Sequence, residues 1–470
     1  MSSELLSVCL LGAGQMAMMT GYLGSSNVLE SVLRSVNARE PSRIDAHAGY
    51  YGQALIYGFY TLANLVTPSL RPILGSKRML IIGSALFTFY QLSFIYLNWI
   101  SFYLSAALMG IGYAVFYTGH GGYLAEHSRR LTLERNSALA QAFAYSSMVV
   151  GGMVLLLSAA ISGDLMPDED DDDVSSALAA NNSAVTRPPK KPKVFRVFSD
   201  SEICYMFAIF GVCSLAACVV MFLLPTKQRK DSLNNQSNAP RKHFLPSIAM
   251  MLRTMGRPPM LLLAVYFLYL GIHSAFVVGV YPTTFTFNKA LSPYRYLPAM
   301  SLTLFGIGDV LSGPRTEFLS KRVKHIGSIF AVLFGTSLWV VLYALIWLST
   351  PEWATVHPTD EPSPFIQPTP LFVLLLSFVL GIADACVMTS RTVIAAVALP
   401  DRRDQSFAIS KFYQSLSTAI FFFASPKMPM TTYIIMLLSG ALIGCLAYLH
   451  VAVSVIRRER AARKNITPLS

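Results

Sequence analysis

The sequence predicts an all-α membrane protein with twelve transmembrane helices arranged as two repeats of six. Two observations lead to this prediction: a strongly apolar composition and a series of long apolar stretches. Of the 470 residues, 53% are apolar and only 13% are charged, whereas soluble domains carry about 25% charged residues. Together with the mean hydropathy of +0.49, this composition excludes a disordered chain, a coiled coil and an ordinary cytosolic enzyme.

Twelve apolar stretches have the length needed to cross a bilayer. A hydrocarbon core of ~30 Å requires about 20 residues per helix. Isolated strands would leave backbone polar groups unsatisfied in lipid, so the stretches are predicted to be helices. They lie near residues 5–26, 50–70, 78–98, 101–123, 138–161, 201–225, 259–284, 297–314, 326–348, 370–396, 406–424 and 431–456.

The 37 lysine and arginine residues are spread unevenly over the loops, and this predicts the orientation of the chain. If the N-terminus is cytoplasmic, the cytoplasmic segments hold 24 of these residues and the opposite side holds 11. Basic loops favour the cytoplasm, so both termini are predicted to be cytoplasmic. For the membrane in which the protein resides, two candidates are kept: the plasma membrane and the endolysosomal membrane.

The chain is expected to divide into an N-terminal six-helix bundle (1–225), a basic cytoplasmic linker (226–258) and a C-terminal six-helix bundle with a cytoplasmic tail (259–470). The basic linker is suited to contact anionic lipid headgroups. The loop near 162–200 falls on the non-cytoplasmic side and contains the sequon that begins at Asn181. Asn181 is therefore a candidate for glycosylation.

The two halves of the chain resemble one another. Arg71-Pro-Ile-Leu-Gly-Ser-Lys-Arg78 follows the second span, and Arg315-Thr-Glu-Phe-Leu-Ser-Lys-Arg322 follows the eighth, with the arginine and the Ser-Lys-Arg end in the same places. The Gly-Ile-Gly-Tyr-Ala segment at 110–114 matches Gly-Ile-Ala-Asp-Ala at 381–385. Two parallel six-helix repeats are the plan of the major facilitator superfamily.

More specific motifs resemble the uncoordinated-93-like branch of the major facilitator superfamily. They include Asn64-Leu-Val-Thr-Pro68 in the second span and Phe407-Ala-Ile-Ser-Lys411-Phe-Tyr-Gln414 in the eleventh. Nearly the whole chain except the loop at 162–200 takes part in the resemblance. It implies a membrane protein of the facilitator fold that regulates a potassium channel or escorts a membrane receptor.

The sequence departs from the superfamily pattern at three places. The loop after the second span lacks the acidic residue of the Gly-x-x-x-Asp-Arg-x-Gly-Arg-Arg signature and keeps only Gly75, Lys77 and Arg78. His120 and His273 stand where the resemblance leads us to expect glutamine and glutamate. A coupling mechanism of the superfamily that needs those groups is therefore not transferred to this chain.

Four charged residues lie at membrane depth in the C-terminal half. A charge at the centre of a transmembrane helix costs at least ~2.5–3.5 kcal/mol. We predict one buried polar cluster made of Asp309, Asp384, Arg391 and Lys411. The alternative is that Arg391 and Lys411 extend to the cytoplasmic headgroups, and that Asp309 only braces a turn at Gly313.

Several uncharged polar residues are also expected inside the spans. His120 and His273 are candidates to line the central cavity, with a buried, hydrogen-bonded histidine as the alternative. Asn27, Asn64 and Gln414 are expected to form hydrogen bonds between helices.

No motif indicates an enzyme, a cofactor or a metal. There is no nucleophile elbow and no P-loop, and the six cysteines lie in apolar stretches without metal-ligand spacing. The expected partners are the bilayer, a membrane channel or receptor, and a small solute, but no nucleic acid. Two functional hypotheses stay open: a non-enzymatic regulator or escort of a channel or receptor, and a secondary transporter, for which Asp384 is the candidate for proton coupling.

Overall fold

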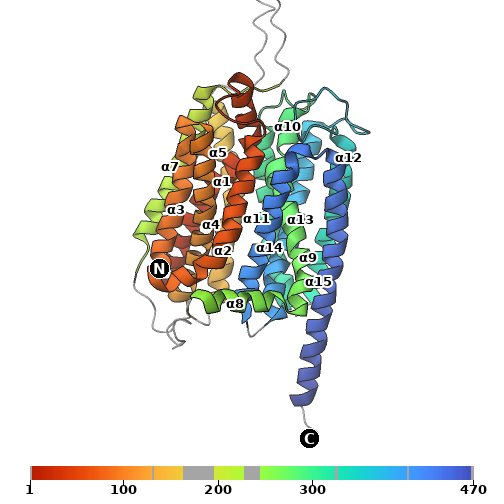
Figure 1. Cartoon of the computed structure of the whole chain (residues 1–470). Coiled ribbons are helices and arrows are strands. Elements are labelled where there is room, and N and C mark those ends of the chain that lie inside the picture. The colour runs from red at the N-terminus through yellow and green to blue at the C-terminus, as the bar shows by residue number, and fades with distance from the viewer. Residues whose placement is uncertain are drawn as a thin grey trace, which may run out of the picture.

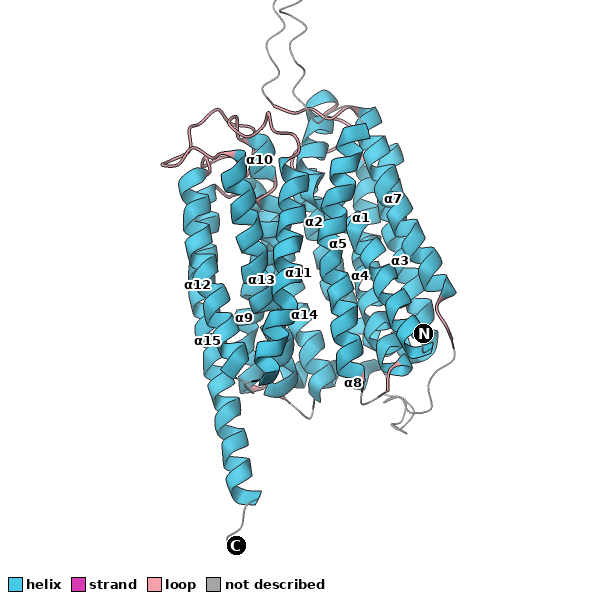
Figure 2. Ribbon diagram, turned by 180° about the vertical axis from the view of Figure 1, so that it is seen from behind, coloured by secondary structure: helices cyan, strands magenta, loops and turns pink. Residues whose placement is uncertain are grey.

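The computed structural model describes most of the chain, and it is almost entirely helical (Figures 1 and 2). The described residues are 3–129, 132–161, 195–226, 244–322, 326–399 and 402–466. In them, nine helices are long and apolar enough to cross a membrane. Nine of the twelve predicted spans are therefore matched by such helices, and the chain is an integral membrane protein.

The helices of the first half lie side by side in one part of the bundle (Figure 1). They are α1 (Ser3–Arg39), α2 (Ala48–Leu74), α3 (Ser76–Leu92), α4 (Trp99–His127), α5 (Leu133–Ile161) and α7 (Asp200–Leu223).

The second half contributes six long helices and two short ones. The long helices are α9 (Pro258–Ala275), α11 (Leu297–Arg322), α12 (Ile326–Ser349), α13 (Pro370–Ala398), α14 (Arg403–Ala424) and α15 (Met430–Ile466). The short ones are α8 (Phe244–Met255) and α10 (Thr283–Phe287).

Equivalent helices pack in the same way in the two halves. In the first half α1 packs against α5 and α7, and α2 against α4; in the second half α9 packs against α14 and α15, and α11 against α13. The two hydrophobic cores follow the same division. One core comes from residues 8–224 together with Ala299, and the other from residues 251–455 together with Tyr50. The exact boundaries of the two bundles stay a prediction.

Two pairs of helices join the halves. α2 packs against α14, and α5 against α11; Figure 2 shows α5 and α11 side by side. Two of these four helices, α2 and α14, are outside the group of nine apolar spans, whereas α11 is apolar over Leu297–Ser312. The polarity of α2 and α14 has a physical reason, because a helix that faces the other half of the protein need not be apolar on that side.

Both termini lie at one end of the bundle, together with α8 (Figure 1). We call this the lower end and the other the upper end. α8 lies within the segment that the sequence analysis treats only as a linker. It contacts α2 and α14, and its Thr254 hydroxyl accepts a hydrogen bond of 2.9 Å from the guanidinium of Arg402.

Three helices extend beyond their predicted ends. α1 continues to Arg39 rather than ending near residue 26, and α15 continues to Ile466. α11 runs through Gly313, so the predicted turn at that residue is wrong. In α1 the polar residues Asn27, Glu30, Ser31 and Ser35 are buried, and side chains that bond inside the protein let a helix continue where an apolar stretch ends.

Particular residues fix where helices begin. Asn98 and Ser101 form a reciprocal capping box at the start of α4, and such boxes satisfy backbone N–H groups that have no partner within the helix. Gly75 separates α2 from α3 with a φ angle of 78°. A positive φ angle strains most residues with a Cβ atom, so glycine permits this tight turn in the degenerate signature loop.

Glycines let α11 and α13 approach closely. A Cβ atom on Gly308 would overlap the carbonyl oxygen of Phe378, and one on Gly381 would overlap the carbonyl oxygen of Phe305. The reciprocal contact brings the two backbones together next to Asp309 and one turn before Asp384. Close helix approach at small residues is a common way to associate helices in membranes.

We expect Gly381→Ala to destabilise the bundle by about 1–3 kcal/mol, because the added methyl group would force the α11 and α13 backbones apart. Gly58→Ala in α2 is the matched control, because a Cβ atom there has no neighbour within 4 Å. Thermal unfolding in detergent measures the difference. Equal melting temperatures for the two variants would contradict the close packing.

Candidate functional site

A buried histidine–aspartate pair lies in the second half of the bundle. His273 is fully buried near the end of α9, and its Nε2 lies 2.9 Å from the Oδ1 of Asp384 on α13. Its Nδ1 hydrogen bonds with the hydroxyl of Tyr343 on α12. With a neutral ring, Nε2–H donates to the carboxylate and Nδ1 accepts from the hydroxyl. The imidazole thus joins three helices.

The surroundings of His273 restrict the ring further. The indole of Trp339 packs on it, with 4.0 Å between ring centroids. A π-helical turn, η2 (Phe276–Val280), follows directly after α9, and π turns within α-helices are frequent at functional sites. η2 contacts α1 of the other half. The histidine therefore lies close to the place where the two halves meet.

Asp309 on α11 is buried without a hydrogen-bond partner. The residue is 1% exposed, and neither of its carboxylate oxygens has a partner in the described part of the chain. Asp309 interacts electrostatically with Asp384. An isolated carboxylate is very costly to bury, so a bound proton or a cation would stabilise this arrangement.

Tyr145 on α5 brings the first half of the chain to this acidic group. It interacts electrostatically with both Asp309 and Asp384, and its hydroxyl lies 3.5 Å from that of Thr389 on α13. Among the described residues, no group of three or more histidine, cysteine or acidic side chains could hold a metal ion.

The basic residues form a second group. Arg391 on α13 donates a hydrogen bond to the Gln414 side chain on α14, whose amide donates to Ser274 on α9 at 3.2 Å. Lys411 interacts electrostatically with Arg391. Its ammonium lies 5.4 Å from the ring centroid of Tyr117 on α4, where a cation–π attraction acts.

The four predicted charges are therefore placed in two groups rather than in one. Asp384 pairs with His273 on a facing helix and not with Arg391, which lies two turns further along the same helix. The Arg391 side chain instead reaches α14. Of the predicted polar residues, Gln414 forms hydrogen bonds to two other helices.

The other predicted site residues are more isolated. The His120 ring lies beside Phe116 and Tyr117, and its Nε2 has no hydrogen-bond partner among the described residues. Asn27 lines a cavity of about 20 Å³, which has room for about one water molecule. One polar atom each of Asn27 and Asn64 is buried without a partner in the described chain. Asn181 lies outside the described residues.

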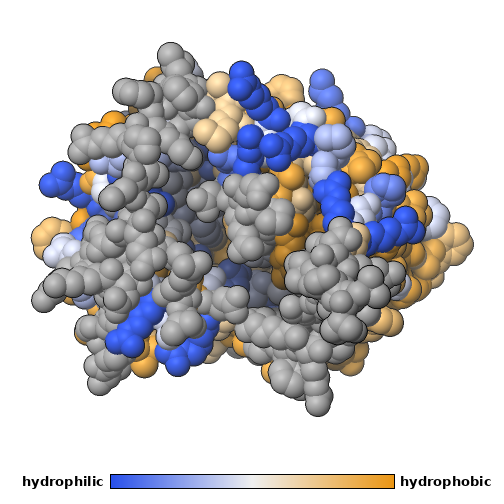
Figure 3. All heavy atoms as spheres, turned by 90° about the horizontal axis from the view of Figure 1, so that it is seen from below, coloured by the Kyte–Doolittle hydropathy of each residue, from blue (hydrophilic) through white to orange (hydrophobic). Residues whose placement is uncertain are grey.

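The two halves are connected by hydrogen bonds at the upper end. The hydroxyl of Tyr50 on α2 donates to the carbonyl of Thr355 at 2.6 Å. The guanidinium of Arg34 on α1 donates to the carbonyl of Val356 at 2.8 Å, and the Ser31 and Thr286 hydroxyls lie 2.6 Å apart. These upper contacts close that end. Figure 3 shows the lower end, where hydrophilic residues stand at several places on the face.

A buried glutamate holds the upper end of α2 in place. One carboxylate oxygen of Glu30 accepts a hydrogen bond of 3.1 Å from the backbone N–H of Tyr50, and the other lies 3.1 Å from the His47 ring. A carboxylate at a helix N-terminus interacts favourably with the helix dipole. The interaction positions Tyr50, which in turn contacts the other half.

Sequence reasoning missed Glu30, Tyr50, Trp339 and Tyr343. Glu30 carried a usable signal, because it is an acidic residue close after an apolar stretch. Trp339 and Tyr343 carried none: aromatic residues are common in spans, and only the packing of α12 against the rest of the second half shows their contacts with His273.

Comparison with known families gives a match over most of the chain. A family model described as "Ion channel regulatory protein UNC-93" matches residues 40–449. The chain is 26% identical to the "UNC93-like protein MFSD11" of Xenopus tropicalis, over 98% of each chain. It is 22% identical to the "Protein unc-93 homolog A" of Bos taurus, over 90% of this chain and 87% of that one.

Solved structures of transporters share the fold. The fucose:proton symporter FucP of E. coli superposes with a TM-score of 0.57 and 13% identity, over 96% of this chain and 99% of that one. The peptide transporter POT in complex with sulfate gives a TM-score of 0.61 and 9% identity, over 96% and 94%. At these identities the likeness shows the major facilitator fold, as the sequence predicted.

Two substitutions that each remove a buried polar group are expected to change stability in opposite directions. His273→Leu leaves the Asp384 carboxylate without its hydrogen bond to the imidazole and should lower stability by about 1–3 kcal/mol. Asp309→Leu removes a carboxylate that has no hydrogen bond, so stability should be unchanged or higher. Melting temperatures in detergent test both expectations. A larger loss in Asp309→Leu than in His273→Leu would contradict the observed bonding.

Proposed function

Because this chain belongs to the UNC-93 family of the major facilitator fold, we propose that it is a non-enzymatic regulator or escort of an ion channel, of the potassium-selective type, or of a membrane receptor. The family match over residues 40–449 carries this proposal, since its description is that of an ion channel regulatory protein.

The degenerate signature loop supports a role other than solute transport. Arg71, in the last turn of α2 just before this loop, lies 3.9 Å from the carboxylate of Glu126 on α4, and the Ser76 hydroxyl after Gly75 donates to the same carboxylate at 2.8 Å. These contacts stay within the first half. The loop therefore stabilises its own half, and the upper contacts hold the two halves together. Both features are suited to a stable scaffold.

We place the lower end in the cytoplasm. The excess of basic residues in the lower loops favours this orientation, which puts both termini and the basic linker on the cytoplasmic side and Asn181 on the opposite side, where it could be glycosylated. The plasma membrane and the endolysosomal membrane are both compatible with it. In this proposal residues 1–225 form the N-terminal six-helix bundle and residues 259–470 form the C-terminal one.

A second function, proton-coupled secondary transport of a small solute, is favoured by one observation. Asp309 is buried without a hydrogen bond, next to Asp384 and its histidine partner. When two neighbouring carboxylates share a site, one of them favours the protonated form, because both cannot be charged at low cost. Such a group at membrane depth can couple proton binding to a change in structure.

The regulator proposal predicts a stable membrane partner. We would purify the tagged chain in mild detergent and identify bound proteins by mass spectrometry, comparing wild type with Asp384→Asn and Lys411→Met at equal expression. A near-stoichiometric channel or receptor should be present with wild type and reduced at least tenfold with either variant. Asp360→Asn and Lys427→Met are matched controls at exposed positions, and should retain the partner.

The transporter alternative makes a different prediction, which is tested at Asp309. Proteoliposomes with wild-type protein should accumulate a solute when a pH gradient is imposed, and Asp309→Asn should abolish this uptake, while Asp360→Asn leaves it intact. Uptake by purified wild type without any bound partner would argue against the regulator proposal. A partner lost in the variants, with no uptake, would support it.

A further inference from the structure

Two basic side chains lie close to each other inside the bundle, where its two halves meet. Arg391 on α13 and Lys411 on α14 interact electrostatically, and as like charges they repel each other. Arg391 comes seven residues before the end of α13, and Lys411 comes eight residues after the start of α14. At a rise of 1.5 Å per residue, both lie about 10–12 Å above the lower ends of their helices.

Neither side chain has an acidic partner in the part of the chain that the structure describes. Arg391 donates a hydrogen bond to Gln414, and Lys411 makes no hydrogen bond to a described residue. The acidic side chains of this half interact elsewhere, since Asp384 bonds to a histidine and Asp309 interacts with Asp384. The two positive charges are therefore not neutralised by any described residue.

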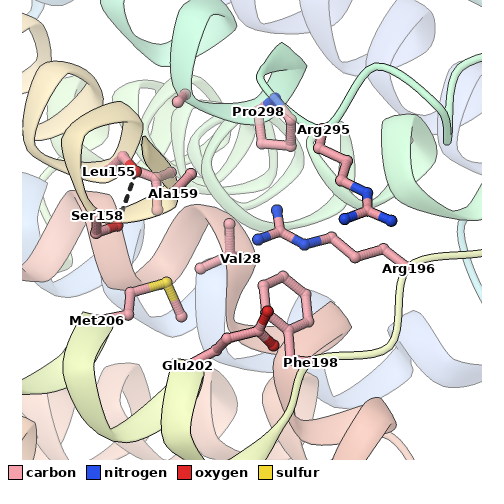
Figure 4. Close-up of a pocket in the computed structure, with 11 residues that line it drawn as sticks. Val28, Leu155, Ser158, Ala159, Arg196, Phe198, Glu202, Met206, Arg295 and Pro298 are labelled. Atoms are coloured by element: carbon pink, nitrogen blue, oxygen red, sulfur yellow. Dashed lines mark hydrogen bonds between the residues drawn. The ribbon is translucent and has the colours of Figure 1, made fainter. Parts of the chain in front are cut away.

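A second pair of basic residues, at the upper end, has a different environment. Arg196 and Arg295 line a small pocket together with the carboxylate of Glu202 (Figure 4). A carboxylate in the same pocket supplies counter-charge from the chain itself. Arg391 and Lys411 have no such carboxylate, so an anion from outside the chain would be needed to balance them.

The first half presents aromatic rings to the two charges. The Lys411 ammonium lies 5.4 Å from the ring centroid of Tyr117 on α4, and Arg391 interacts electrostatically with Tyr117 and with Tyr60 on α2. The ring of Tyr113 packs against both tyrosines, with centroid distances of 5.2 Å to Tyr117 and 4.6 Å to Tyr60. Three neighbouring tyrosine rings thus lie opposite the two positive charges.

His120 adds a hydrogen-bonding group on the same side of α4. It comes three residues after Tyr117 and therefore shares a helix face with it, and the two ring centroids lie 6.4 Å apart. Its Nε2 is buried without a hydrogen-bond partner among the described residues. A buried polar atom without a partner costs free energy, so a ligand that accepts a hydrogen bond from Nε2 would reduce this cost.

We propose that Arg391 and Lys411 form a binding site for a small organic anion, whose acidic group lies between the two charges and whose planar apolar body lies against the tyrosine rings. Guanidinium groups bind carboxylate and phosphate oxygens in pairs, and small-molecule sites combine aromatic walls with a few polar groups. Both side chains keep accessible surface. Because the upper contacts close the other end, the anion enters from the lower end.

A bound anion would connect the two halves. α13 and α14 of the second half would hold its acidic group, and α2 and α4 of the first half would contact its body. Such a ligand favours the arrangement in which these helices face each other, because it binds that arrangement most tightly. The site goes beyond the proposed regulatory function and does not depend on it, since binding can be measured on the purified chain without a partner protein.

The test is thermal unfolding of the purified full chain in detergent, with benzoate or phenyl phosphate as the probe. A ligand that binds only the folded state stabilises it, so at least one probe should raise the melting temperature by about 2 °C or more relative to sodium chloride at equal ionic strength. Benzamide, which has the shape of benzoate without its charge, should give less than a third of this rise. No rise with either probe, or an equal rise with benzamide, would overturn an anion site.

Two variants with matched controls locate the effect. The rise should fall by at least half in Arg391→Gln and in Lys411→Met. It should persist in Arg78→Gln and Lys427→Met, because Arg78 and Lys427 are exposed and lie outside the proposed site. An unchanged rise in both site variants would overturn the location.

Two further measurements complete the test. Inorganic phosphate should give less than half the rise of the better probe, and an equal rise would overturn the role of the tyrosine rings. Should the site variants fail to fold, a photoactivatable benzoate on wild type decides the location instead. Crosslinks within 113–120 or 407–418 that benzoate prevents and benzamide does not prevent support the site, and crosslinks confined elsewhere refute it.

Discussion

The structure depends on the hydrogen bonding of α13 inside the membrane. A bilayer supplies no water to a polar side chain, so hydrogen bonds within the bundle stabilise the polar groups that lie at membrane depth. Asp384 on α13 bonds to His273 on α9, which bonds to Tyr343 on α12. Arg391 on α13 reaches Gln414 on α14, and Ser377 pairs with Ser301 on α11. One helix thus holds four others in place, and the glycine contact with α11 allows it to do so.

The two halves repeat one architecture with different interiors. Where the two halves meet, the first half contributes tyrosine rings, such as those of Tyr60 and Tyr113, whose centroids lie 4.6 Å apart. The second half contributes charged side chains. Lys411 over the ring of Tyr117 joins the two kinds of interior. The two repeats therefore keep the same helix contacts but differ in their side chains. The four charged side chains predicted at membrane depth all lie in the second half.

Hydropathy predicted most spans because lipid contact requires apolar side chains; α12 begins at the predicted residue and ends within one residue of the prediction. It failed at α1, where Glu30 and Arg34 bond to other parts of the protein and let the helix continue. The charges Asp309 and Asp384 could be found because charges in spans are rare. Their partners could not: His273 lies 111 residues from Asp384, and only the packing of α9 against α13 brings them together.

We infer that this chain is a closed scaffold rather than a protein that opens each end in turn. The most direct measurement is the distance between spin labels at Glu40 and Glu361, exposed upper-end residues in opposite halves, in a background with the six cysteines replaced. Our account predicts one distance population that is the same at pH 5.5 and pH 7.5, because the upper contacts of Arg34 and Tyr50 persist. A second, longer population that grows when the pH changes would contradict it.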